Sequence, residues 1–169
     1  DVYKRQGKQE NEVQISIREK SMLYEKDFLA WTQQQSELLR QGRWQEVDLD
    51  HLVQELDDMG KSNHWELESR LVVLIAHLLK WEFQLNQLQD QWKEFDGRSW
   101  RKTIIEQRIQ IERLMQDCPS LSSHFDTILQ QAFPTALKLV YKETQLPPST
   151  FPQECHYLSE QLLDKDFLT

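Results

Sequence analysis

The chain has 169 residues, of which 38% are hydrophobic and six are Trp, and its formal net charge at pH 7 is −8. The apolar content argues against intrinsic disorder, and the negative charge argues against general binding of nucleic acid, whose phosphates it repels. Two cysteines supply no disulfide framework, so a reducing cytoplasm is the expected location. No apolar run is long enough to span a bilayer, so we expect no membrane partner.

The first 21 residues are expected to lie outside the folded domain. They begin with DVYKRQ, which reads as the translation of a sequencing-library adapter, and they show no core-forming pattern. We therefore predict a disordered or artefactual extension over 1–21, a start at Met22, and a single all-α domain over 22–169. Thermal unfolding of a chain that begins at Met22 should match that of the full chain. A fall of more than a few degrees, about 1 kcal/mol, would contradict this expectation.

Two helices are predicted between Asp27 and Gly60. The first runs from about Asp27 to Gln41 and ends at Gly42, with an inner face of Phe28, Trp31, Leu38 and Leu39. The second follows Asp48 and directs four apolar residues inward: Leu52, Val53, Leu56 and Met59. Asn63 and Glu66 form a capping-box pattern that favours a break at Gly60, although one continuous helix to Trp81 stays open.

A central amphipathic helix is predicted around 62–84. Its apolar residues are spaced by four, three, four and three, which fits a helix and excludes a strand: Leu67, Leu71, Leu74, Leu78 and Trp81. Ile75 widens this face, and Val72 and Leu79 lie on a second one. We therefore expect this helix to be covered on more than one side.

Further helices are predicted after a polar, Gln-rich stretch. Ser99 is the expected cap of a helix from Trp100 to about Asp117, whose apolar stripe includes Arg108. A long helix then starts near Leu121, with a kink expected at Pro134, and a short one lies near 158–163. The predicted fold is therefore an all-α, single-domain helical bundle of about six to seven helices.

Ordered motifs along the chain resemble one known family. They are Tyr24…Asp27-Phe28…Trp31, Leu39-Arg40-x-Gly42, Asp48…Leu52…Glu55…Met59-Gly60, Leu67-Glu68-x-Arg70-Leu71…His77-Leu78-Leu79-Lys80-Trp81, Ser99-Trp100-Arg101-x-Thr103-Ile104…Gln107-Arg108, Pro119-Ser120-Leu121, Glu143-Thr144, Phe151-Pro152 and Leu163…Phe167. From Met22 to Phe167 the chain resembles the bacterial, mainly cyanobacterial, family called domain of unknown function 29. The resemblance implies an all-α cytoplasmic protein and brings no activity. One departure is Gln84 to Arg98, which is longer than the usual link.

Arg70 and His77 are the candidate catalytic residues. They lie two helical turns apart on one side of the central helix. An arginine and a histidine on one helix resemble the pair of HEPN-type ribonucleases, in which imidazole moves a proton and guanidinium holds a phosphate. The spacing is at the loose end for that motif. The structural alternative is an ion pair between Arg70 and Glu66, with His77 a boundary residue.

Arg108 defines a second candidate site because it falls within an apolar stripe. A buried charge needs a partner, and Glu55 or Asp58 is the expected one, with Glu55 preferred. This ion pair is the structural interpretation. The functional one is a polar cluster of Glu55, Asp58, His77, Arg101 and Arg108.

No cofactor or metal site is predicted. The Cys and His residues that could bind metal have no familiar ligand spacing: Cys118, His124, Cys155 and His156. Two functions therefore stay open. The first is a non-enzymatic helical module that binds a protein partner, and the second is a metal-independent ribonuclease that uses Arg70 and His77.

Overall fold

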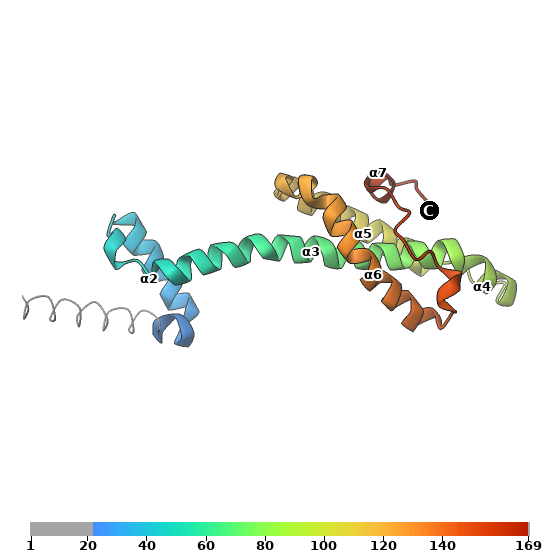
Figure 1. Cartoon of the computed structure of the whole chain (residues 1–169), viewed down its shortest axis with the longest axis horizontal. Helices are drawn as coiled ribbons and strands as arrows, with labels where there is room; N and C mark the ends of the chain where they lie inside the picture. The colour runs from blue at the N-terminus through green and yellow to red at the C-terminus, as the bar shows by residue number, and fades with distance from the viewer. Residues whose placement is uncertain (1–21, 169) are drawn as a thin grey trace, which may run out of the picture. The chain divides into compact units, whose positions relative to one another are not determined.

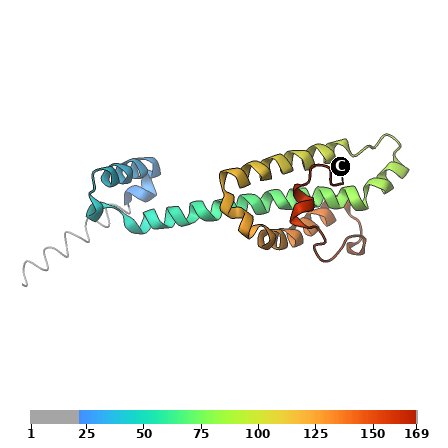
Figure 2. The ribbon, with the colours of Figure 1, turned by 90° about the horizontal axis from the view of Figure 1, so that it is seen from above.

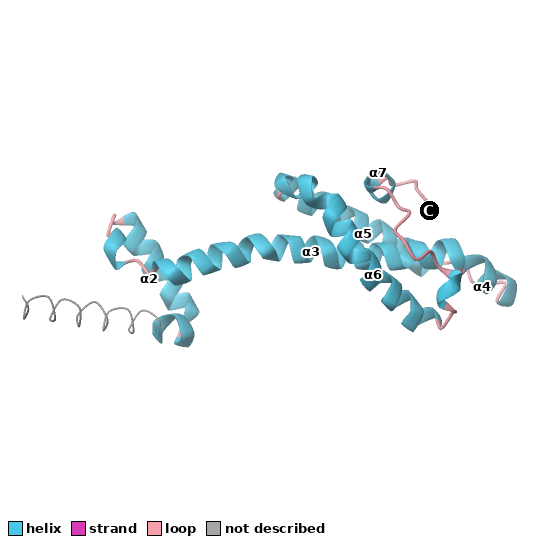
Figure 3. Cartoon of the chain, in the orientation of Figure 1, coloured by secondary structure: helices cyan, strands magenta, loops and turns pink. Residues whose placement is uncertain are grey.

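The computed structural model describes residues 22–168 (Figure 1). Every regular element in this range is helical (Figure 3), which confirms the predicted all-α class. The expectations for 1–21 concern residues that lie outside this range. The chain divides into two compact units, with the boundary between Met59 and Gly60. Unit 1 precedes this boundary and unit 2 follows it.

Unit 1 is built from a helical turn over 22–26, α2 (Phe28–Arg40), the short 3-10 helix η1 (Trp44–Glu46) and the start of α3 (Leu49–Phe83). The Asp27 carboxylate caps α2 by accepting a hydrogen bond of 2.9 Å from the backbone nitrogen of Ala30. Gly42 follows α2 with φ of 70°, a left-handed conformation that suits glycine. The predicted limits of this helix are therefore confirmed.

The inner face of α2 differs from the prediction at one position. Trp31 and Leu38 are buried as expected, but Phe28 is 49% exposed and Gln35 is buried in its place. Phe28 lies in the first turn, and its ring stacks on Trp31 at the edge of the unit, with 5.6 Å between ring centroids. The buried face of α2 therefore consists of Trp31, Gln35 and Leu38, which are spaced by four and three residues.

The helix α3 runs without interruption through Gly60, so the break favoured by the capping-box pattern does not occur. A glycine costs a helix about 1 kcal/mol relative to alanine. A break would instead leave backbone groups unsatisfied at two new helix ends. A Cβ atom added at Gly60 would meet no heavy atom within 4 Å, so packing does not require a glycine there.

Unit 2 is organised around the second half of α3. This segment lies beside α5 (Arg98–Asp117) and α6 (Phe125–Thr144) in both views (Figures 1 and 2), and all three share one core. Four residues of the predicted stripe are fully buried: Leu67, Leu71, Leu74 and Leu78. Ile75 and Leu79 are also at 0% exposure, which confirms that α3 is covered on more than one side.

Shorter elements complete unit 2: α4 (Leu85–Gln91), η2 (Pro119–His124), η3 (Pro148–Thr150) and α7 (Ser159–Leu163). The prediction of a short helix near 158–163 is confirmed by α7. Pro134 lies inside α6, which continues past it to Thr144. In α5, Arg108 lies on the buried face together with Ile104 and Ile111, as its position among the apolar residues of this helix predicted.

The connection into α5 differs from the expectation that Ser99 is the cap. The helix begins at Arg98, and Gly97 precedes it in the left-handed conformation with φ of 66°. A side chain at Gly97 would place its first carbon 2.9 Å from the Trp81 ring and from Leu85, so only glycine fits. The Asp96 carboxylate accepts from the backbone nitrogen of Arg98 at 3.0 Å, which supplies the side-chain acceptor expected from Ser99.

Candidate functional site

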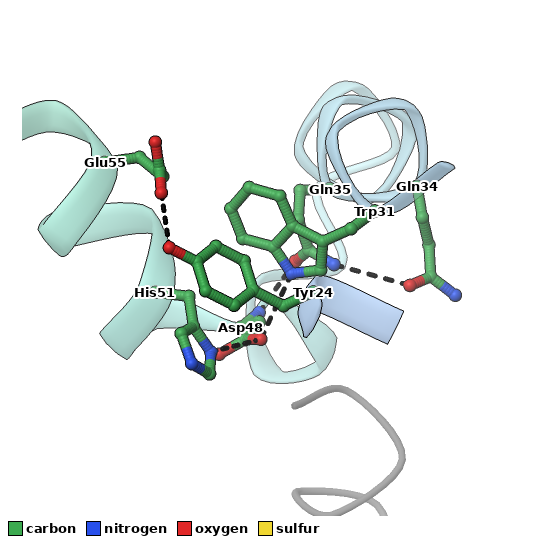
Figure 4. Close-up of polar contacts among 7 residues, drawn as sticks. All are labelled: Tyr24, Trp31, Gln34, Gln35, Asp48, His51 and Glu55. Atoms are coloured by element: carbon green, nitrogen blue, oxygen red, sulfur yellow. Dashed lines mark hydrogen bonds and ion pairs between the residues drawn. The ribbon is translucent and has the colours of Figure 1, made fainter. Parts of the chain in front are cut away.

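A buried polar network joins α2 to the start of α3 in unit 1 (Figure 4). The indole nitrogen of Trp31 donates to the carboxylate of Asp48 at 3.1 Å. The backbone nitrogen of Asp48 donates to the side-chain oxygen of Gln35 at 2.7 Å. All three residues are buried, so each bond satisfies a polar group that has lost its water. This network fixes the first turn of α3 against α2.

His51 and Tyr24 extend the same network. The Nδ1 atom of His51 lies 2.8 Å from the Asp48 carboxylate, and the Tyr24 ring stacks on the imidazole with 4.0 Å between centroids. The Tyr24 hydroxyl donates to Glu55, and this bond is the main reason that the pKa of Tyr24 is raised (Figure 4). Among the described residues no hydroxyl or thiol bonds to the Nε2 atom of His51.

Sequence patterns did not point to this network as a site. Gln35 lies four residues after Trp31 and three before Leu38, so its place on the inner face of α2 was readable from helical spacing. The partner of Gln35 was not readable, because Asp48 comes from a different segment. The network therefore depends on how two segments meet.

Arg70 and His77 each have local partners on α3. Arg70 donates to the Glu66 carboxylate at 2.7 Å and 3.0 Å, which is the ion pair of the structural alternative. His77 is half-buried, and its Nδ1 lies 2.8 Å from the carbonyl oxygen of Val73. Among the described contacts, none joins Arg70 to His77.

Lys80 forms the most buried charged contact around His77. Its ammonium lies 2.6 Å from the Glu143 carboxylate, 5.4 Å from the centre of the Trp100 ring and 3.5 Å from Nε2 of His77. These partners come from α6, α5 and α3, so one cation links three helices of unit 2. Burial is the main reason that the pKa of His77 is lowered, and the charge of Lys80 lowers it further.

The Lys80–Glu143 pair is expected to respond asymmetrically to mutation. The Lys80 side chain is 8% exposed and that of Glu143 is 40% exposed. Glu143→Ala strands a buried ammonium and should cost about 1–3 kcal/mol of unfolding free energy. Lys80→Met keeps the volume and leaves a carboxylate that water can reach, so it should cost less than about 1.5 kcal/mol. Urea unfolding of both variants measures the difference, and a larger loss for Lys80→Met would contradict the assignment.

His77 is expected to make stability depend on pH. Its pKa is lower in the folded chain than the unfolded value of about 6.5, so the unfolded state binds more protons as pH falls below that value. The stability of the folded chain that depends on a neutral His77 is therefore fully present above pH 6.5 and is lost as pH falls toward the folded pKa. Urea midpoints at pH 7.5 and 5.5 should differ more for the wild type than for His77→Gln. If the urea midpoint changes equally with pH in both proteins, His77 is not the cause of the pH dependence.

Arg108 is bonded to backbone carbonyl oxygens of the C-terminal segment. Its guanidinium donates to the carbonyl oxygens of Leu162 at 2.9 Å, Lys165 at 3.3 Å and Phe167 at 2.9 Å. In unit 1, Glu55 accepts a hydrogen bond from the Tyr24 hydroxyl. Burial lowers the pKa of Arg108, opposed by the nearby charges of Asp164 and Asp166. Each of the three guanidinium nitrogens thus donates to one carbonyl oxygen of this segment.

The other members of the predicted polar cluster lie in separate surroundings. Arg101 lies exposed on α5, His77 is beside Lys80, and Arg108 contacts the C-terminal segment. Glu55 and Asp58 lie on α3 in unit 1, where Asp58 is exposed. Arg101, His77 and Arg108 thus have distinct environments within unit 2.

The first turns of α3 carry an exposed apolar face, which corrects the prediction that it points inward. Val53 is 49% exposed, Leu56 60% and Met59 66%, and only Leu52 is half-buried. Leu49, at 64% exposure, adds to this face. At 100° per residue, Leu49, Val53 and Leu56 lie within about 60° of one another. We call these three residues the apolar stripe.

The described residues contain no group of three or more His, Cys, Asp or Glu side chains arranged to hold a metal ion. Within the same range, 22–168, no helix is long and apolar enough to cross a membrane.

Comparison with known proteins gives one match. A family model described as domain of unknown function DUF29 matches residues 23–168. No curated protein and no solved structure matches the chain. The matched range contains α2 to α7, the network around Asp48, the Lys80 cluster and the apolar stripe. Because the match extends over far more than half of the 169 residues, the chain belongs to the DUF29 family.

Proposed function

We propose that this protein is a cytoplasmic, non-enzymatic interaction module that binds a protein partner through the apolar stripe. One observation carries the proposal. Of the thirteen large apolar side chains that are exposed in the described part of the chain, eight lie in residues 22–59. Exposed apolar side chains that gather in one region mark interaction sites, whereas single ones are ordinary.

The buried network behind the stripe supports the proposal. Asp48 and Gln35 hold the first turn of α3 against α2, and Glu55 is bonded to Tyr24 on the helix's other side. The stripe is therefore presented on a fixed helix. Fixing a binding surface before association lowers the entropy that binding costs.

The charge around the stripe indicates the chemistry of the partner. Residues 22–59 contain nine acidic and three basic side chains, a formal charge of −6. Asp50 and Asp57 lie on one edge of the stripe, about 80–100° from Leu49 around the helix. A partner surface with apolar anchors and neighbouring basic residues is complementary to it.

The geometry around Arg70 and His77 gives the ribonuclease alternative less support. A base for the 2′-hydroxyl of RNA needs an accessible nitrogen with a lone pair. Nε2 of His77 lies 3.5 Å from the buried ammonium of Lys80, and Arg70 is engaged by Glu66. These contacts favour structural roles, so the interaction module is the better supported function.

The experiment compares three baits in extracts of cells that express the protein naturally. They are the wild type, Leu56→Glu in the stripe, and Leu158→Glu as the control, since Leu158 is 63% exposed in unit 2. All three should unfold at similar temperatures, because exposed substitutions usually change stability by less than about 0.5 kcal/mol. A partner retained by the wild type and the control but reduced at least about tenfold by Leu56→Glu supports the proposal. Equal recovery by all three baits would overturn it.

A further inference from the structure

An open groove lies on the outer face of α5. It has a volume of about 510 Å³ and is lined by seven residues of that helix: Arg98, Arg101, Lys102, Ile105, Glu106, Ile109 and Gln110. Ile105 is 43% exposed and Ile109 is 52% exposed, one helical turn apart. The groove therefore has an apolar half that nothing in the described part of the chain covers.

The other half of the groove is basic. Arg101 and Lys102 lie one turn before Ile105, both are exposed, and neither has an ion-pair partner among the described residues. Arg98 pairs with Asp96 at 3.0 Å. Two uncompensated cations are notable in a chain with a net charge of −8. They favour an apolar helix that carries acidic side chains at one end.

The apolar stripe of α3 has acidic residues along one edge, and Asp57 lies at its C-terminal end. Leu49, Val53 and Asp57 follow one another at intervals of four residues, and so do Ile109, Ile105 and Arg101 when α5 is followed in the opposite direction. Both intervals correspond to about 6 Å along a helix axis. An antiparallel pairing thus matches Leu49 to Ile109, Val53 to Ile105 and Asp57 to Arg101. Lys102, adjacent to Arg101, reaches the same end.

We propose that two copies of this chain associate by docking the apolar stripe of one copy, antiparallel, into the α5 groove of the other. This inference rests on the proposed function and names its partner as a second copy. The pairing covers apolar side chains on both surfaces and places the Asp57 carboxylate opposite Arg101 and near Lys102. In a parallel arrangement Asp57 would face Arg113, one turn beyond Ile109, and Arg101 and Lys102 would meet no carboxylate, so their charges favour the antiparallel pairing.

The test is a charge swap measured on the full chain by sedimentation over a range of concentrations. The wild type should dimerise, and Arg101→Glu/Lys102→Glu should weaken the dimer at least about tenfold, as should Asp57→Lys. Combining the changes should restore association to within about threefold of the wild type, because the charges are then exchanged and not removed. Raising the salt concentration should weaken the wild-type dimer, since exposed charges are screened.

Matched controls separate this pairing from an effect of net charge. Lys138→Glu/Lys142→Glu on α6 changes net charge as much as the double change on α5, and Glu154→Lys matches Asp57→Lys; all three residues are exposed. These controls should leave the dimer unchanged. A wild type that stays monomeric, or a swap that does not restore association, overturns the second copy as the partner. The chain could prove monomeric while its wild-type bait retains a different protein that the Leu56→Glu bait does not. The proposed function then holds, and only this inference fails.

Discussion

Replacing Leu74 with Ala is expected to remove about 2–5 kcal/mol from the free energy of unfolding. Leu74 is at 0% exposure in the middle of the buried face of α3, among residues from α3, α5 and α6. The substitution loses the transfer free energy of the deleted methyl groups and leaves a cavity that close-packed neighbours fill only in part. Urea unfolding followed by circular dichroism measures the loss.

The matched control is Leu56→Ala on the same helix. Leu56 is 60% exposed, so the same truncation should change stability by less than about 0.5 kcal/mol. A urea midpoint for Leu74→Ala close to that of the wild type would show that this face of α3 is not the core of unit 2. Such a result would also undermine the division between a buried and an exposed segment of α3.

Replacing Arg108 with Met is expected to destabilise the chain and release its C-terminal segment. The guanidinium bonds to the carbonyl oxygens of Leu162, Lys165 and Phe167, and Arg108 is 4% exposed. Each carbonyl left unsatisfied in a buried position costs about 1–3 kcal/mol, partly offset because the charge no longer has to be desolvated. A loss of about 2–4 kcal/mol follows if one or two carbonyls stay buried without a partner.

Two measurements distinguish this role of Arg108 from an ion pair. Hydrogen exchange should become faster in residues 159–168 of the variant, because the segment has lost its anchor. A double-mutant cycle with Glu55→Gln should give no coupling, since Glu55 has a different described partner. Arg113→Met is the control on α5, because Arg113 is exposed. Unchanged exchange in 159–168 together with strong coupling to Glu55 would refute the assignment.

Helical spacing alone predicted much of the fold. The burial of Arg108 and of the leucine stripe on α3 follows from a period of about 3.6 residues, and the limits of α2 follow from Asp27 and Gly42 at its ends. These are local properties, because spacing fixes which side chains share a face. The helix start at Arg98 was missed because Gly97, two positions before Ser99, supplies the left-handed turn and Asp96 supplies the side-chain acceptor.

The candidate sites were less predictable because polar partners come from distant segments. The sequence placed Arg108 inside the fold but did not point to the carbonyl oxygens that accept its hydrogen bonds. Every residue carries a carbonyl oxygen, so residue types do not reveal that Leu162, Lys165 and Phe167 are its acceptors. The network of Asp48 with Trp31 and Gln35 was missed for the same reason, since it forms where α2 meets α3.

The sequence by itself determined that this protein is all-α, that its central helix is buried between Leu67 and Leu79, and that Arg108 lies within the core. Only the tertiary structure decided which apolar helix faces are buried against another segment. Leu49, Val53 and Leu56 show the same periodicity as Leu67, Leu71 and Leu74, yet the first three are exposed and the second three are buried. Periodicity reports that a helix has an apolar face, whereas burial depends on whether another segment packs against it.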